Sequence, residues 1–96
     1  MMYRMEIFSN QSVQDDILET LEEYIPHILY TTVPIAYGRG GESRKLGTST
    51  WPETNFILVS YLADSDVPLA KAVIKGIKKR FPNEGIKLFF VHAEDV

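Results

Sequence analysis

Four segments of the chain have the apolar pattern of β-strands, and apolar residues recur with helical spacing along two others. The four strands are predicted at 3–9, 28–37, 55–62 and 86–92. Apolar residues recur every three or four positions at 13–25 and 69–81, which predicts two amphipathic helices. The predicted order is therefore strand, helix, strand, strand, helix, strand.

Capping and breaking residues mark the ends of these elements. Ser12, with Asp15 three residues later, resembles a capping box and predicts the start of the first helix. Pro26 ends that helix, and Pro68 suits the first turn of the second. Pro34 donates no ladder hydrogen bond, so the second strand is predicted to be an edge strand or to carry a bulge.

This order predicts one ferredoxin-like βαββαβ sandwich over residues 1–96, an α+β fold with a four-stranded antiparallel sheet and two helices on one face. The third and fourth strands are apolar on both faces. The helices cover only one of these faces, so the other predicts an interaction surface, most simply between copies of the chain. Its predicted members are Ile57, Val59, Tyr61, Phe89 and Val91.

Composition removes several classes of function. The net charge of −3 argues against general binding of nucleic acid or anionic membranes, and the absence of cysteine excludes disulfides and thiolate catalysis. The first helix is acidic and the second is basic, a pattern that favours pairing between helices over a nucleic-acid patch. Neither a membrane span nor a signal peptide is recognisable, so a cytoplasmic protein without direct membrane insertion is expected.

A long polar, glycine-rich connection separates the second and third strands at 38–51. Loops of this length in compact domains are often functional. The first residues of this connection could bind an anion closely, through backbone N–H groups of the glycines and the guanidinium of the arginine. The predicted ligand-binding residues are Gly38, Arg39, Gly40 and Gly41. A flexible hairpin tip that binds nothing is the alternative interpretation.

The same connection is predicted to be structureless and mobile, with Trp51 packing on the domain body at its end. Brief trypsin treatment should then cut first at Arg39, Arg44 or Lys45.

No group of residues has the spacing of a catalytic centre. The two histidines, His27 and His92, lie far apart in the sequence, and no metal site is expected from their spacing. Ser43 and the hydroxyls at 48–50 have no histidine base nearby in the sequence. The chain is predicted not to be an enzyme.

The element order, the domain size and the run Ala36-Tyr37-Gly38-Arg39 at the start of the long loop resemble the PII-type nitrogen regulatory proteins and their PII-like relatives. The resemblance implies a homotrimer with inward-facing sheets and an adenine nucleotide as effector. It adds Lys87 to the ligand residues, as the nearest base to the family's phosphate-binding loop. It also implies that the long loop signals to a partner protein, through Glu42, Ser43, Arg44 and Lys45.

Two departures from the family pattern lead to a further expectation. The family's glutamine after Gly-Arg is Gly40 here, and its phosphate-binding loop is reduced to the short connection Phe81–Gly85. Any nucleotide should therefore bind more weakly than it does to classical members. A CutA-like divalent-metal tolerance protein and a ligand-free structural trimer stay as alternatives, and titration with nucleotides and with copper or zinc separates the three.

Overall fold

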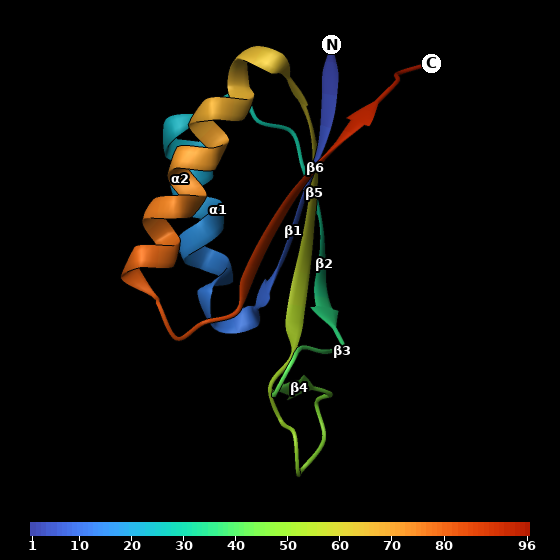
Figure 1. The fold of residues 1–96 in the computed structure, drawn as a ribbon, viewed down its shortest axis with the longest axis vertical. Coiled ribbons are helices and arrows are strands. Elements are labelled where there is room, and N and C mark those ends of the chain that lie inside the picture. Colours follow the sequence, from blue (N-terminus) through green and yellow to red (C-terminus); the bar gives the residue numbers. More distant parts are fainter.

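The computed structural model describes residues 1–96 and forms two layers, with both helices on one face of a four-stranded sheet (Figure 1). The predicted ferredoxin-like βαββαβ fold is confirmed. The sheet and helices are β1 (Met2–Asn10), α1 (Gln14–Tyr24), β2 (Thr31–Ala36), β5 (Asn55–Ala63), α2 (Val67–Arg80) and β6 (Ile86–Ala93). Single 3₁₀ turns at Gln11–Val13 and Asp64–Asp66 lead into the two helices.

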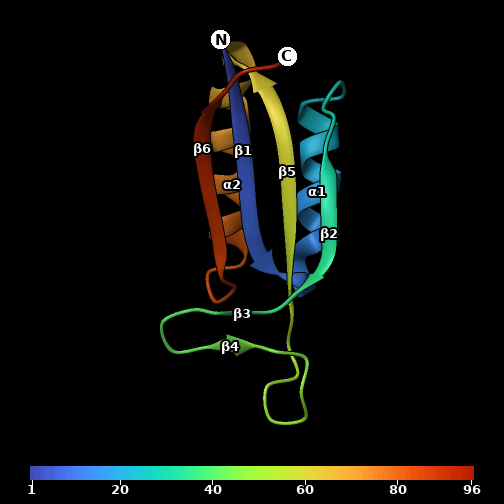
Figure 2. The same ribbon diagram turned by 90° about the vertical axis from the view of Figure 1, so that its right-hand side faces the viewer.

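The strand order is β2-β5-β1-β6, and every neighbouring pair is antiparallel. Strands β2 and β6 are thus the two edges, with α1 behind the β2 side and α2 behind the β6 side (Figure 2). The expectation for Pro34 is confirmed, because β2 is an edge strand and its register shifts between Val33 and Ala36. A missing backbone donor costs little where no further strand needs it.

The core lies between the sheet and the helices, as the alternation predicts. Met5, Ile7, Phe56 and Leu58 are fully buried from the central strands. The helices add a cluster of fully or nearly fully buried side chains: Ile17, Leu21, Ala70, Val73, Ile74 and Ile77. Burying this area supplies most of the stabilisation of the fold, at about 25 cal/mol per Å² of apolar surface.

The start of the first helix differs from the sequence expectation. Asn10, and not Ser12, is the capping residue, because its Oδ1 accepts a hydrogen bond from the Ser12 backbone N–H at 3.4 Å. Asparagine at the end of a strand readily bonds the backbone two residues further on. The chain therefore makes a 3₁₀ turn first, and α1 begins at Gln14. Pro68 lies in the first turn of α2, as predicted.

The helices run antiparallel, and one ion pair joins them. Arg80 Nη2 at the end of α2 lies 3.5 Å from Asp16 Oδ1 at the start of α1. The predicted complementarity of an acidic and a basic helix is thus limited to a single contact at one end. Such an exposed pair contributes about 0–1 kcal/mol.

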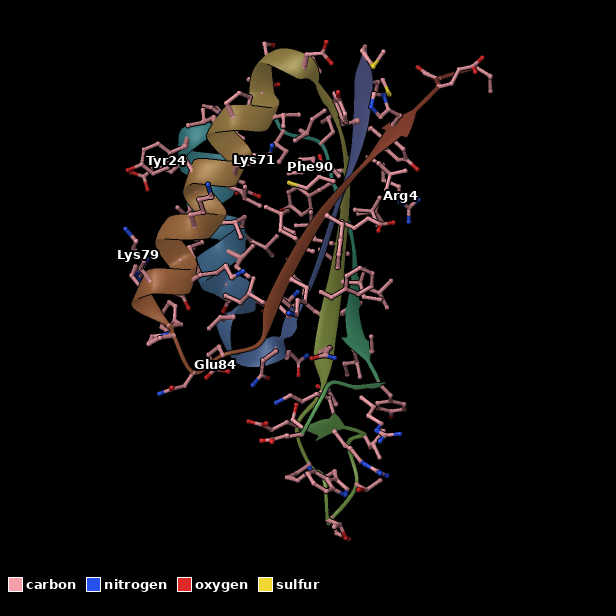
Figure 3. The ribbon with its side chains drawn as sticks, in the orientation of Figure 1. Arg4, Tyr24, Lys71, Lys79, Glu84 and Phe90 are labelled. Carbon is pink, nitrogen blue, oxygen red and sulfur yellow. The ribbon has the colours of Figure 1, made fainter.

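The face of the sheet away from the helices is apolar and open to solvent, as predicted. Phe89, Tyr61 and Val91 are about half exposed, at 51%, 52% and 49%. One charged pair stands among them: Arg4 Nε donates to Glu6 Oε2 at 2.7 Å. We call this surface the open sheet face; Arg4 projects from it, away from the helices (Figure 3).

Neither helix has the length and apolarity that spanning a membrane requires.

Candidate functional site

The long loop contains a small hairpin where the sequence predicts a structureless connection. Strand β3 (Gly38–Arg39) pairs antiparallel with β4 (Arg44–Lys45), and the Gly40 N–H donates to the Ser43 carbonyl at 2.8 Å. A Cβ at Gly38 would lie 2.9 Å from Asn55 Nδ2, so any larger residue there would have to displace the Asn55 side chain. The glycines therefore allow a tight ordered turn. Whether the loop moves in solution stays a prediction.

A cavity of about 340 Å³ opens between this hairpin and the end of the sheet. Its size lies within the range of small-molecule sites. Its lining residues come from four segments of the chain: β1, residues 36–45 at the start of the long loop, the beginning of β5, and residues 85–87 where β6 begins. The lining residues are Phe8, Ala36, Tyr37, Gly38, Arg39, Gly40, Ser43, Lys45, Asn55, Ile57, Gly85 and Lys87.

Most of the predicted ligand residues come together in this cavity. Gly38, Arg39, Gly40 and Lys87 line it, although Lys87 lies far from the others in the sequence. Gly41 is not among the lining residues, because it occupies the tip of the hairpin turn.

The four residues predicted to contact a partner divide between two environments. Ser43 and Lys45 line the cavity, whereas Glu42 and Arg44 stand outside it on the exposed side of the hairpin.

Positive charge dominates the cavity. Arg39, Lys45 and Lys87 contribute three cations, and no carboxylate is among the lining residues. Arg39 and Lys87 take part in no ion pair. The apolar residues that line the cavity are Phe8, Ala36, Tyr37 and Ile57. The arrangement suits a ligand with an anionic group and a flat apolar part.

Lys45 connects the hairpin to the body of the domain. Its Nζ lies 2.5 Å from Glu53 Oε2, and its side chain is only 13% exposed. Asn10 Nδ2 donates to Glu84 Oε2 at 2.7 Å and, more weakly, to Glu53 Oε1 at 3.4 Å. The Asn10 side chain, at the end of β1, thereby links the hairpin to the turn before β6. Glu84 lies in the turn that leads from α2 to β6 (Figure 3).

A second set of bonds fixes the same end of the sheet. The Gln11 backbone N–H donates to the Thr54 carbonyl at 3.0 Å, and its side chain donates to the Pro34 carbonyl at 2.9 Å. Asn10 donates its own backbone N–H to the Gly85 carbonyl at 3.1 Å. The turn after β1 thus holds three separate segments around the cavity.

The Lys45–Glu53 ion pair, which anchors the hairpin, should be lost at acid pH. The hydrogen bond from Lys45, then that from Asn10, lowers the pKa of Glu53 below its usual range. A lowered carboxyl pKa means that the contact is fully formed above the ordinary glutamate pKa and is lost as pH falls through the lowered value. Trp51, the only tryptophan, stands two residues away, so its fluorescence should report this loss as a step at acid pH. Glu53→Gln should lack the step, and an identical acid transition in that variant would contradict the assignment.

The distal part of the loop has its own turn. Gly47 has a φ of +64°, and a Cβ there would lie 3.0 Å from the Tyr37 ring. The Thr48 N–H donates to the Trp51 carbonyl, and the Trp51 N–H to Thr48 Oγ1, both at 3.0 Å. Trp51 is 38% exposed and bonds within the loop. The expected packing of the Trp51 ring on the domain body stays a prediction, and the Lys45–Glu53 contact is an anchor of the loop that the sequence did not predict.

Brief trypsin treatment should cut first at Arg39 or Arg44, the two exposed arginines of the hairpin. Lys45 belongs to the predicted first sites as well, but its partly buried ion pair should delay cleavage there. Mass spectrometry of the early fragments is the measurement, with Arg39→Gln/Arg44→Gln as the variant that should survive longest. Early cleavage in α2, at Lys78, Lys79 or Arg80, would show that the loop is not the most mobile element.

The histidines lie away from the cavity and from each other. His27 Nε2 is 2.8 Å from Asp66 Oδ2 near the start of α2, and the His92 ring packs on Tyr3 at a centroid distance of 4.6 Å. No cluster of three or more histidine or carboxylate side chains suited to a metal ion occurs in the structure.

Comparisons with known proteins give no match by sequence but clear matches by structure. No model of a known protein family matches the chain, and no curated protein sequence matches it. A structure of CPII from Thiomonas intermedia K12, described as a nitrogen regulatory PII-like protein bound to ADP, AMP and bicarbonate, superposes with a TM-score of 0.65. That match has 13% identity and covers 94% of this chain and 85% of CPII. The chain has the fold of the PII-like signalling proteins.

Two further structures share this fold. A putative PII-like signalling protein from Thermus thermophilus matches with a TM-score of 0.62 and 15% identity, over 94% of this chain and 84% of that one. A DUF3240 family protein from Shewanella baltica matches with a TM-score of 0.68 and 11% identity, over 99% of this chain and 92% of that one. At such identities the likeness concerns the PII-like fold alone.

Proposed function

We propose that this protein is a non-enzymatic PII-like regulator that binds a small anionic effector at the base of its long loop and presents the loop to a partner protein. One observation carries the proposal: Arg39 and Lys45 of the hairpin and the sequence-distant Lys87 of β6 line one cavity that has no carboxylate among its lining residues. Two of them, Arg39 and Lys87, have no counter-ion within the chain. An anionic ligand supplies the missing charge.

An adenine nucleotide is the leading candidate for this effector. In this proposal Arg39 and Lys87, which both line the cavity, bind the phosphate oxygens, and Phe8 and Ile57 contact the flat base. The structurally similar CPII is described as bound to ADP, AMP and bicarbonate. The turn before β6 is short and offers few backbone donors, which supports the expectation of weaker binding than in classical PII proteins.

Binding in the cavity has a direct route to the loop. Arg39 and Lys45 belong to the same hairpin, so a ligand that engages them acts on the segment that carries Glu42 and Arg44 at its exposed side. We propose that the occupied and empty states present this exposed side differently to a partner protein. Regulation of this kind needs binding alone and no chemical step.

We also propose that the working form is a homotrimer. The open sheet face is an apolar surface that a monomer leaves in water, and the resemblance to PII-like proteins implies that this face turns inward around a three-fold axis. Its burial adds about 25 cal/mol per Å² to a domain of only 96 residues.

Calorimetric titration with ADP, AMP, ATP and cyclic AMP tests the ligand. Arg39→Ala and Lys87→Ala should each weaken binding of the nucleotide that binds best about tenfold or more, since a charged hydrogen bond contributes about 1.5–3 kcal/mol. Arg44→Ala removes the same kind of charge from the cross-strand neighbour of Arg39 outside the cavity, so it should bind normally. Affinity should also fall as salt is raised.

The same titrations separate the alternatives. Unchanged affinity in both Arg39→Ala and Lys87→Ala would place the site elsewhere. Absence of heat and of a thermal shift with all four nucleotides would contradict the nucleotide proposal. A response to copper or zinc in their place would favour a CutA-like role.

A further inference from the structure

The edge of the molecule formed by α2 and β6 carries a row of unpaired lysines. Lys71, Lys75 and Lys78 line a shallow groove of about 330 Å³ whose floor includes Leu88 and Phe90. None of the three has a carboxylate within 4.0 Å. The Lys71 ammonium lies 5.6 Å from the centre of the Phe90 ring, in the angle between helix and strand (Figure 3). Three like charges are thus held beside an unpaired strand edge.

The opposite edge, formed by α1 and β2, carries acid. Glu22 Oε1 accepts a hydrogen bond from the Tyr30 hydroxyl at 2.5 Å, just before β2 begins, so Glu22 lies on the β2 side of the helix. Asp15 precedes it by seven residues, or two helical turns, and lies on the same side. Asp16, in contrast, faces α2 through its ion pair with Arg80. The β2 edge is therefore lined by Asp15 and Glu22.

We infer that copies of this chain associate head to tail, with the lysine edge of one copy against the acidic edge of the next. The inference rests on the proposed homotrimer and specifies how its subunits meet. Two like edges repel each other, whereas unlike edges attract. A ring of head-to-tail contacts uses every edge once and leaves no strand edge open to further chains.

The heights of the charges along the strands agree with such a ring. One row of register partners crosses the four strands through Thr31, Val59, Glu6 and Phe89. Tyr30 precedes Thr31 and Phe90 follows Phe89, and β2 and β6 run in opposite directions, so Tyr30 and Phe90 are at the same height along the strands. Glu22, bonded to Tyr30, is therefore at the height of Lys71, which contacts Phe90.

The second pair of charges lies at matching heights too. The helices are antiparallel, so seven residues back from Glu22 and seven onward from Lys71 lead in the same direction. Both steps cover about 10.5 Å, which brings Asp15 level with Lys78.

A rotation axis parallel to the strands preserves these heights and the strand directions. Because β2 is antiparallel to β6 within one chain, the β2 of the next copy also runs antiparallel to β6. Lys71 then faces Glu22 of the next copy, and Lys78 faces its Asp15.

This arrangement places the candidate site at a subunit boundary. Val33, Ile57, Phe8 and Lys87 share one level across the sheet. Val33 of the next copy therefore lies beside Lys87, and its β2 forms an additional wall of the cavity. The hairpin of the first copy crosses below the sheet toward its β6 side (Figure 2), so its tip extends toward the same boundary.

Charge reversal tests the inference by light scattering coupled to size exclusion. Lys71→Glu/Lys78→Glu and Asp15→Lys/Glu22→Lys should each weaken the trimer about tenfold or more, because two attractive contacts per interface become repulsive. The combined four-site variant restores opposite charge at every interface and should recover the wild-type trimer. Circular dichroism of each variant checks that it folds.

Matched controls separate edge contacts from other effects. Lys79→Glu and Glu23→Lys change charge on the outer surface of the helices and should leave the trimer unchanged; Lys79 points away from the sheet (Figure 3). Tyr30→Phe removes the bond to Glu22 without reversing a charge, and it too should assemble normally.

Three results would overturn the inference. If the wild type is monomeric, the proposed trimer fails together with it. If the wild type is trimeric and both edge variants stay trimeric, the trimer stands and this edge pairing is wrong. Binding of a polyglutamate peptide to wild-type trimer but not to Lys71→Glu/Lys78→Glu would mean that the lysine row is free in the trimer and serves an acidic partner.

Discussion

Phe89→Asp is expected to convert the trimer into a monomer. Phe89 stands on the open sheet face, where its ring packs edge-on against Phe8 at 6.2 Å and its neighbour across β1 is Glu6. An aspartate there places a second carboxylate beside Glu6 and removes an aromatic ring from the surface to be buried. Desolvating an unpaired charge costs several kcal/mol, and three copies would meet around the axis.

Light scattering gives a direct result. The wild type should show about three times the chain mass of 11.0 kDa, and the variant should show the mass of one chain at the same micromolar concentration. Tyr24→Asp is the control, because Tyr24 is 55% exposed at the end of α1 and points away from the sheet (Figure 3). A trimeric Phe89→Asp would show that the open sheet face is not the assembly surface.

Asn10→Ala is expected to destabilise the protein by about 2–3 kcal/mol, because its side chain caps the turn before α1 and donates to Glu53 and Glu84. Losing a helix-type cap costs about 1 kcal/mol, and losing a hydrogen bond to a charged group costs about 1.5–3 kcal/mol. The residue is 4% exposed, so water replaces these contacts poorly.

Urea unfolding of the purified variant measures this loss. Trypsin should also cut the hairpin sooner, because the link from Glu53 to the body of the domain is weakened. Asn83→Ala is the matched control, since Asn83 lies in the exposed turn before β6. Surface substitutions usually change the free energy of unfolding by less than about 0.5 kcal/mol. A change of that size in Asn10→Ala would show that the bonds of the Asn10 side chain do not stabilise the fold.

The layers of the fold follow from the sequence because alternation and helical periodicity report burial directly. Every residue that the pattern of β5 places toward the core, such as Phe56 and Leu58, is buried, and those placed away from it form the open sheet face. The error at the first helix has a local cause. Ser12 and Asn10 are both good capping residues, and only the path of the chain after β1 decides which side chain reaches the free N–H.

The candidate site is harder to predict because it depends on register. Lys87 joins Arg39 only through the pairing of β6 with β1, and a shift of one residue would turn Lys87 to the other face. The family resemblance, rather than the local pattern, indicates Lys87. The sequence predicts Lys45 as a contact to a partner protein, yet Lys45 lines the cavity. Its position depends on the ion pair with Glu53, which the composition of the loop does not indicate.

Two residues of the site carry a signal in the sequence outside the long loop. Asn10 directly follows a predicted strand, which is a common place for a side chain that bonds the backbone of the next turn. Phe8 alternates onto the open sheet face, and that placement is correct. Its role as a cavity wall depends on where the hairpin folds, which the sequence does not show.

The Arg4–Glu6 pair has a consequence for how specific the association of copies is. The two residues are two positions apart on one strand, and Arg4 also donates to the Tyr61 hydroxyl at 3.0 Å. Each copy thus neutralises the charges at the centre of its open sheet face before it meets another. Such a face discriminates poorly, because any apolar surface of similar shape satisfies it. Discrimination between identical and foreign subunits must then come from the charged edges of the sheet. A paralogous chain with different charges at these edges would be excluded from the assembly.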